Sequence, residues 1–248
     1  MLIFATTTMI VLISCSKEKI ETPQTQHGVG EPVEEIAVSS QRAGLNTAVN
    51  LNKGLLGLFE FNGNMKERNG RLPAGQTNDG SPAFYTTDRN GLRGKAIKMT
   101  GNYRVHLNHI PHSPEMSLVA WIKYDSSSQT MCNFITGESD GPRFAHAFNK
   151  FYASNTVSAN PFIASDSVDN DWHHLVATID GTYLRFYVDG ILINTILSPD
   201  FQQIVMTKYV IGYGIVLGPD TNWPGAVDDL RFYDRAITPA EVKALLNL

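Results

Sequence analysis

Hydrophobic and polar residues alternate in many short runs along this chain, and turn sequences separate the runs. Three such runs are Trp172–Ile179, Tyr183–Val188 and Ile191–Thr195, which are joined by Asp180-Gly181 and Asp189-Gly190. Asp-Gly is a strong hairpin signal, because glycine accepts the positive φ of a tight turn without steric cost. The segment therefore predicts an antiparallel meander, which excludes an α/β fold for the central part of the chain.

Further strands are expected on both sides of the meander. They are predicted at Leu55–Phe61, Ala83–Thr86, Ala96–Met99, Tyr103–Leu107, Met116–Tyr124, Cys132–Thr136, Pro142–Phe148, Phe151–Ala153, Tyr209–Tyr213 and Ala226–Tyr233. Thr238-Pro239-Ala240-Glu241 combines an N-cap, a proline at the first helical position and a capping box, which predicts a short helix through Leu246. The elements together predict an all-β fold, a two-sheet antiparallel jelly-roll sandwich with a short C-terminal helix.

The N-terminal segment has a different character. Met1 to Ser14 is apolar and too short to span a bilayer comfortably, which is typical of the apolar region of an export signal. Leu12-Ile13-Ser14-Cys15 resembles the bacterial lipobox, in which the cysteine is lipidated and becomes the mature N-terminus. No Lys or Arg precedes the apolar run, so an ordinary signal peptide and a start site further upstream remain alternatives. We expect residues 1–15 to be a lipoprotein signal peptide with Cys15 as the lipidation site.

Residues 16–53 are polar and lack sustained periodicity. This composition predicts a flexible linker between a lipid anchor and a folded domain at residues 54–248. Ser16-Lys17-Glu18-Lys19 loosely resembles the signals that carry Bacteroidetes-type lipoproteins to the cell surface, and a plain solvated linker is an equally good interpretation. The protein is therefore expected to be exported and anchored in the bacterial cell envelope, at the outer membrane, with surface exposure as an option.

Charge and cysteine content argue against nucleic acid as a partner and against a disulfide bond. The formal net charge is −4 and the isoelectric point is near 6.0, which gives no basic surface for nucleic acid. No cationic amphipathic helix indicates membrane-surface binding. The second cysteine, Cys132, has no disulfide partner once Cys15 carries lipid. Cys132 lies in a predicted strand, where packing in the core is expected.

Four segments together resemble the laminin-G-like, concanavalin-A-like jelly-roll family, especially its bacterial lipoprotein members. These segments are Gly57–Asn64, Met116–Lys123, Asp171–Ala177 with Tyr187–Gly190, and Gly225–Thr238. Their order and spacing agree with the family from about Gly54 to Leu248. The resemblance implies a concanavalin-A-like fold and leaves the function open, because this fold serves lectins, adhesion modules, glycosidases and spacers.

A structural calcium ion is one implication of the resemblance, because many family members hold Ca²⁺ between the first-strand turn and the closing strand. Asp228 resembles the closing-strand carboxylate, while Asn62 and Asn64 occupy the first turn. Oxygen atoms of these types are the ligands that calcium prefers. Asp228 shares a predicted strand face with Leu230 and Phe232, so it is expected to point inward, where a carboxylate needs a cation or several donors. Backbone N–H groups or an arginine are the alternative partners.

Two adjacent histidines, His173 and His174, invite a metal-site hypothesis. Adjacent side chains on a strand point to opposite faces, whereas zinc ligands must converge, and no nearby cysteine or acidic cluster completes a site. We therefore expect structural roles, with one histidine buried beside a hydrogen-bond partner and the other nearer to solvent. Trp172, at the start of the same strand, is expected in the core.

A catalytic site is not expected. Laminarinase-type members of the family place acids at alternate positions of one strand, and only Glu138-Ser139-Asp140 is similar here. It lacks a third acid at the next alternate position and lies in a predicted turn. No Gly-x-Ser-x-Gly sequence or catalytic cysteine context replaces it.

Binding of a carbohydrate would need exposed aromatic rings with polar partners. Trp223 beside Asn222 is a candidate platform, although relatives in the family carry a large apolar residue there, which favours a core position. Further ligand-binding candidates on a sheet face or rim are Tyr103, Arg104, His106, Asn108, Phe144 and His146.

The sequence therefore predicts a non-catalytic, lipid-anchored binding module at the cell surface, with a glycan or a protein as its ligand. A structural or adhesion component of a surface assembly, without a small ligand, is the alternative, and a glycoside hydrolase is the third. An aromatic-lined open groove on the concave sheet would favour the glycan. A flat, polar concave face with an apolar patch elsewhere would favour the assembly.

Overall fold

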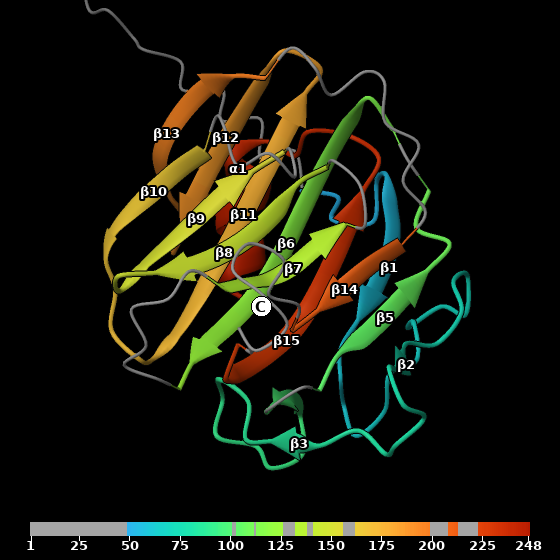
Figure 1. The fold of residues 1–248 in the computed structure, drawn as a ribbon. Helices are drawn as coiled ribbons and strands as arrows, with labels where there is room; N and C mark the ends of the chain where they lie inside the picture. The colour runs from blue at the N-terminus through green and yellow to red at the C-terminus, as the bar shows by residue number, and fades with distance from the viewer. Residues whose placement is uncertain are drawn as a thin grey trace, which may run out of the picture. The chain divides into compact units, whose positions relative to one another are not determined.

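The alternating runs form two antiparallel sheets that pack face to face (Figure 1). The structure is a computed structural model that describes residues 49–100, 103–111, 113–125, 132–137, 141–155, 162–198, 208–212 and 223–248. These residues belong to one compact unit, Thr47–Leu248. The predicted signal peptide, its lipidation site Cys15 and most of the predicted linker lie outside the described residues. Among the residues that are described, no helix is both long and apolar enough to cross a membrane.

Sheet A contains the predicted meander and both ends of the domain. Its strands are β1 (Leu55–Phe59), β3 (Tyr85–Thr86), β4 (Ala96–Met99), β6 (Glu115–Tyr124), β11 (Trp172–Asp180), β12 (Tyr183–Val188), β13 (Ile191–Leu197) and β15 (Gly225–Tyr233). The order across the sheet is β13-β12-β11-β6-β15-β4-β3, and β1 pairs with the second half of β15. The meander prediction is therefore confirmed, with Asp189 and Gly190 both at positive φ in the second turn.

Sheet B lies in front of sheet A in Figure 1. Its strands are β2 (Gln76–Thr77), β5 (Val105–Asn108), β7 (Cys132–Gly137), β8 (Arg143–Ala147), β9 (Lys150–Ser154), β10 (Phe162–Ser167) and β14 (Lys208–Ile211), in the order β10-β9-β8-β7-β14-β5-β2. The predicted all-β sandwich is confirmed. The sequence did not predict β2 and β10, because β2 is very short and the second half of β10 is polar.

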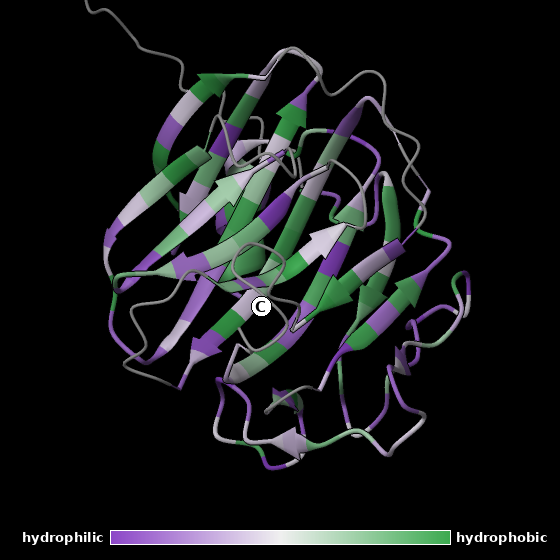
Figure 2. Ribbon diagram, in the orientation of Figure 1, coloured by the Kyte–Doolittle hydropathy of each residue, from purple (hydrophilic) through white to green (hydrophobic). Residues whose placement is uncertain are grey.

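The main core fills the space between the two sheets. In β6, Leu118 and Ile122 alternate with outward-facing residues, and Figure 2 shows the same alternation along most strands. The largest fully buried side chains are Trp223, Tyr124, Tyr209, Tyr233, Phe59, Phe61, Phe134, Phe144, Phe151, Phe186 and Phe232. Burial of one such aromatic stabilises the fold by about 2 kcal/mol before entropy costs are subtracted. Cys132 also belongs to this core, as predicted, and burial raises the pKa of its thiol.

A second, smaller core lies on the outer face of sheet A, where helix α1 (Pro239–Leu246) packs. The helix contributes Val242 and Leu245, and the sheet contributes Val119, Val176 and Tyr187. The helix begins as the sequence predicts, with Thr238 as N-cap and a complete capping box. One face of sheet A is therefore divided between the helix and a polar region.

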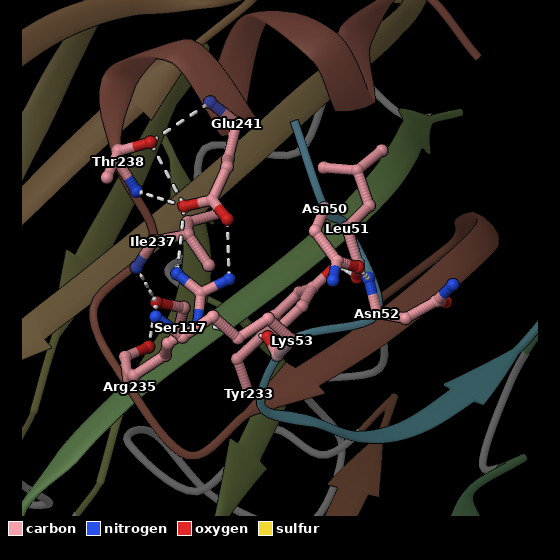
Figure 3. Close-up of polar contacts among 10 residues, drawn as sticks. All are labelled: Asn50, Leu51, Asn52, Lys53, Ser117, Tyr233, Arg235, Ile237, Thr238 and Glu241. Atoms are coloured by element: carbon pink, nitrogen blue, oxygen red, sulfur yellow. Dashed lines mark hydrogen bonds and ion pairs between the residues drawn. The ribbon is translucent and has the colours of Figure 1, made fainter. Parts of the chain in front are cut away.

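A polar junction fixes α1 to the sheet and to the start of the domain (Figure 3). The Ser117 hydroxyl, on β6, donates to the Arg235 carbonyl (2.7 Å) and accepts from the Ile237 N–H (3.0 Å). Arg235 donates from Nη1 to Glu241 Oε2 (2.8 Å) and from Nη2 to Oε1 (2.5 Å). The Thr238 N–H also donates to Glu241 Oε2, at 2.7 Å.

The same junction holds residues that the sequence assigned to the linker. The Tyr233 hydroxyl donates to the Leu51 carbonyl (3.1 Å), and Arg235 Nε donates to the Lys53 carbonyl (2.9 Å). Leu51 also packs against the apolar residues under α1. Leu51 and Lys53 are therefore bound to the folded domain, because backbone carbonyls in a polar segment can accept hydrogen bonds from side chains that sequence patterning does not reveal.

We predict that Glu241→Gln lowers the free energy of unfolding by about 2 kcal/mol at pH 7, because hydrogen bonds to a charged group are lost. The hydrogen bonds from Arg235, with the Thr238 donors, lower the pKa of Glu241 from 4.5 to about 2. This stabilisation is fully present above pH 4.5 and is lost as the pH falls through about 2.

Urea unfolding of the wild type and Glu241→Gln between pH 7 and pH 2 measures the effect. Lys243→Gln, which changes an exposed residue of the same helix, is the matched control. A stability difference that does not shrink toward pH 2 would contradict the assigned role.

Candidate functional site

Strand β15 contains a bulge at the position of the predicted calcium carboxylate. The register with β6 shifts between Asp228 and Arg231, and Asp229 has a φ of 46°. Asp228 lies opposite Trp121, which faces outward because its neighbours in β6 face the core. The prediction that Asp228 points inward with Leu230 is therefore wrong. An extra residue in a bulge reverses the alternation of faces along the strand.

Arg89, from the loop between β3 and β4, is the counter-ion of this bulge. Its Nη1 lies 2.6 Å from Asp228 Oδ2 and its Nη2 lies 2.9 Å from Asp229 Oδ2, with side-chain exposures of 11%, 5% and 17% in that order. The guanidinium also lies over the Trp121 ring, 4.9 Å from its centroid. Burial and the Asp229 carboxylate raise the pKa of Asp228 to about 7, while Arg89 opposes this shift.

The predicted calcium ligands do not converge in the way that Ca²⁺ would require. Asn62 and Asp228 line the same hollow of about 300 Å³, but Asn64 does not line it. The Asn64 side chain instead donates to the Asn62 carbonyl and accepts from the Lys66 N–H. The described residues hold no group of three or more His, Cys, Asp or Glu that could bind a metal. The three predicted ligands therefore do not form one calcium site. Asp228 has both kinds of alternative partner, since Arg89 binds its Oδ2 and the Asp229 N–H donates to its Oδ1 at 2.8 Å.

The two histidines of β11 point to opposite faces, as predicted. His173 Nδ1 lies 2.8 Å from Asp189 Oδ2 and its Nε2 lies 3.1 Å from Asp169 Oδ1. Hydrogen bonding to Asp189 is the largest cause that raises the pKa of His173. His174 is buried against Trp121, and burial lowers its pKa to about 4. Its Nδ1 has no hydrogen-bond partner among the described residues, contrary to the expectation for the buried histidine.

The structure does not gather the predicted ligand-binding aromatics into one exposed site. Trp223 is 1% exposed and stacks on Phe134, with ring centroids 4.8 Å apart, so its side chain is part of the core. Tyr103 is also buried, and burial raises its pKa to about 12. Arg104 and His106 are half-buried on and beside β5, away from Trp223 in the core.

The remaining candidates are distributed over sheet B. Phe144 lies in the core, and His146 is buried against Tyr124 with ring centroids 3.7 Å apart. Burial lowers the pKa of His146 to about 4. Asn108 is half-buried at the end of β5. Glu138-Ser139-Asp140, the acidic pattern weighed for catalysis, lies outside the described residues.

A groove of about 380 Å³ on the outer face of sheet A is the site that sequence reasoning missed. Four residues paired across four strands form its floor: Trp172 of β11, Lys123 of β6, Ala226 of β15 and Lys98 of β4. Its walls include Thr86, Thr87, Asp88, Arg89, Gly91 and Asp125. We call this feature the Trp172 groove.

Trp172 is half-buried on the outer face, so its predicted core position is wrong. Strand alternation carried the signal that was needed, because Leu175 and Ala177 face the core and even-numbered positions of β11 therefore face outward. The core prediction for Trp172 was based on the size and apolarity of tryptophan and did not take this alternation into account. The groove itself needs four strands in register, which sequence alone does not show.

Arg89 should stabilise the fold without calcium. Arg89→Ala leaves the Asp228 and Asp229 carboxylates buried without their guanidinium and should lower the free energy of unfolding by about 3 kcal/mol. Arg93→Ala, in the same loop and exposed, is the matched control. EDTA should leave the melting temperature of the wild type unchanged. A chelator-dependent decrease in melting temperature that Asp228→Ala abolishes would contradict this role and indicate a bound cation.

Comparison with known proteins gives the family of the chain. The family model described as the Concanavalin A-like lectin/glucanases superfamily, of the laminin G type, matches residues 98–243. No curated protein sequence matches this chain.

Solved structures share the fold at low sequence identity. Domain 4 of AbnA, a GH43 extracellular arabinanase from Geobacillus stearothermophilus, in complex with arabinotriose, has a TM-score of 0.61 and 18% identity, with 77% of this chain and 98% of that chain covered. The botulinum neurotoxin serotype C1 binding domain has a TM-score of 0.63 and 13% identity, with 80% and 53% covered. The binding domain of botulinum neurotoxin DC, in complex with rat synaptotagmin II, has a TM-score of 0.60 and 13% identity, with 78% and 51% covered.

This chain therefore spans nearly all of the arabinanase domain and about half of each toxin domain. The likenesses concern the fold, since all three identities are low. The family match shows membership of the family, because it covers more than half of the chain and agrees with the two-sheet architecture. On these grounds, the chain belongs to the concanavalin A-like lectin/glucanases superfamily.

Proposed function

We propose that this chain is a non-catalytic carbohydrate-binding module and that the Trp172 groove is its ligand site. The observation that carries the proposal is a half-buried tryptophan on an open groove beside charged and hydroxyl side chains. One face of a sugar ring is apolar and stacks on an indole, while its hydroxyls need hydrogen-bond partners. The groove also falls in the usual size range of small-molecule sites.

The polar partners lie on both sides of Trp172 along the groove floor and walls. Lys123 is directly opposite Trp172 in the strand register. Lys98 Nζ lies 3.0 Å from Asp125 Oδ2, and both side chains are partly exposed at 39% and 32%. Thr86 and Thr87 add hydroxyl groups to the wall. Donors and acceptors therefore surround one aromatic platform, as binding of a polyhydroxy ligand requires.

The structural neighbours support a binding module. The arabinanase domain was solved with arabinotriose, a glycan, and a toxin binding domain was solved with synaptotagmin, a protein. Both kinds of partner therefore occur on this fold. The Trp172 groove favours the glycan for this chain, because its volume and its single aromatic platform suit a saccharide better than a protein surface.

The groove carboxylates support binding without catalysis. A glycosidase needs two carboxyl groups free to flank the scissile bond, one of them as acid. Asp88 Oδ1 accepts the N–H groups of Asn90 (2.9 Å) and Leu92 (2.7 Å), and thus shapes the loop that carries Arg89. Asp125 is paired with Lys98. Both groups are engaged in structure rather than presented as a catalytic pair.

A protein assembly is the second candidate function, and strand β13 favours it. β13 is an edge strand of sheet A without a charged residue, and Ile191, Leu192 and Leu197 are 68%, 48% and 60% exposed. Apolar edge strands without charge are sites where another chain can add a strand. Sedimentation of the purified protein would detect such pairing as a concentration-dependent increase in mass.

We propose further that lipid on Cys15 anchors this module to the cell envelope, on the strength of the lipobox-like Leu12-Ile13-Ser14-Cys15. Cys15→Ser should release the protein from the membrane fraction into the soluble fraction, because the acylated thiol is absent. Immunoblots of both fractions measure the shift, with Cys132→Ser as the matched control. Membrane retention of Cys15→Ser would contradict the anchor.

For the groove, Trp172→Ala should weaken glycan binding roughly tenfold, which corresponds to about 1.4 kcal/mol of lost stacking. A glycan array with the purified protein identifies the ligand, and calorimetric titration of that glycan measures the affinity. Tyr183→Ala removes an exposed aromatic of β12 and serves as the control. Unchanged affinity of Trp172→Ala would contradict the groove as the ligand site. No glycan bound at high micromolar concentration would contradict the glycan and favour protein assembly as the function.

A further inference from the structure

We propose that the Trp172 groove selects saccharides that carry a negative charge, a carboxylate or a sulfate, and that Lys123 and Lys98 hold this charge above Ala226. The inference rests on the proposed function and specifies the class of ligand. The strand register places Lys123 and Lys98 beside Ala226, and the ion pairs of the groove leave the Lys123 ammonium for a ligand.

The register places two lysines on either side of a methyl group. Ala226 of β15 pairs with Lys123 of β6 on one side and with Lys98 of β4 on the other. Paired residues share one face of a sheet, and neighbouring strands are about 4.8 Å apart, so the two lysine stems stand about 10 Å from each other. Ala226 is too short to fill the space between them. Two ammonium groups can therefore reach one anion over the alanine.

The existing ion pairs leave a positive charge for a ligand. The Lys123 ammonium has no ion-pair or hydrogen-bond partner among the described residues, whereas the Lys98 ammonium is paired with Asp125. Exposed pairs of this kind contribute little to stability, so Lys98 can turn toward a bound anion at small cost. The two lysines and Asp125 together leave one uncompensated positive charge on the groove floor.

The other charged groups of the groove already have partners within the fold. Arg89 is held by Asp228 and Asp229 at the bulge. Asp88 is buried, and its carboxylate accepts two backbone N–H groups of its own loop. The groove lining carries acids as well as bases, so the proposed selection rests on the position of the Lys123 ammonium beside Trp172 and not on a general excess of positive charge.

Trp172 orients a bound sugar ring relative to Lys123. It lies next to Lys123 in the same row of the sheet, so a sugar ring stacked on the indole would place a ring substituent toward the lysine. A uronic acid carries its carboxylate as such a substituent, and a sulfated sugar carries a charged ester there. A neutral sugar would stack equally well but would offer the Lys123 ammonium a hydroxyl oxygen instead of an anion, and hydrogen bonds between two charged groups are the stronger kind.

The test compares a short oligogalacturonate with its methyl ester, which has the same rings without the charge. Calorimetric titration should show the acid binding at least tenfold more tightly than the ester at low salt. Lys123→Gln should remove this preference by weakening the acid and leaving the ester unchanged, and Lys98→Gln should have a smaller effect in the same direction. Lys150→Gln, on β9 of the other sheet, is the matched control. Melting temperatures of the variants verify that each is folded.

A sulfated oligosaccharide and its desulfated form make a second arm that distinguishes the two sources of charge. A preference for either charged form, lost in Lys123→Gln, supports the inference. Equal binding of charged and uncharged forms, with Trp172→Ala weakening both, would overturn the charge selection and leave the glycan site intact. Binding that neither Trp172→Ala nor Lys123→Gln affects, or no binding of any form, would overturn both.

Discussion

The bulge of β15 is the constraint on which the rest of sheet A depends. β15 pairs with β6 along one edge, and on its other edge it pairs first with β4 and then with β1. The change of partner from β4 to β1 coincides with the bulge at Asp228 and Asp229. The carboxylates turned outward there would repel each other without a cation. Arg89 supplies one from the loop before β4, so this loop and the end of β4 are fixed together with the closing strand.

Local patterns in the sequence predicted the fold correctly, but they did not predict the Trp172 groove. Asp-Gly turns and the capping box at Thr238 act within a few residues, so the meander and α1 could be found. The bulge is a tertiary feature that the sequence does not reveal. Its extra residue reverses the alternation of faces, so the prediction that Asp228 points inward was wrong. Trp172 was misplaced for a different reason, because residue size was given more weight than strand position. Trp223 illustrates the converse, since its family position indicated the core more reliably than its loop sequence indicated a surface.

The location of the groove alters where binding is sought on this fold. The Trp172 groove lies on the outer face of sheet A, which also carries α1. The helix covers only part of sheet A, and Arg89 with Trp121 forms the polar boundary of the uncovered part. The proposed ligand site and the Arg89 ion pairs therefore share one face, and the loop from Asp88 to Leu92 contributes to both through its backbone and through Arg89.

The hydrogen bonds that hold Leu51 and Lys53 to Tyr233 and Arg235 have a mechanical consequence. A pull on the chain ahead of residue 49 loads these two contacts first and then the antiparallel ladder between β1 and β15. Ala226, on the floor of the groove, belongs to that same strand β15. Tension between a tethered N-terminus and a ligand held in the groove would therefore pass through β15 to its neighbours on the groove floor, β6 and β11, and would remain within sheet A.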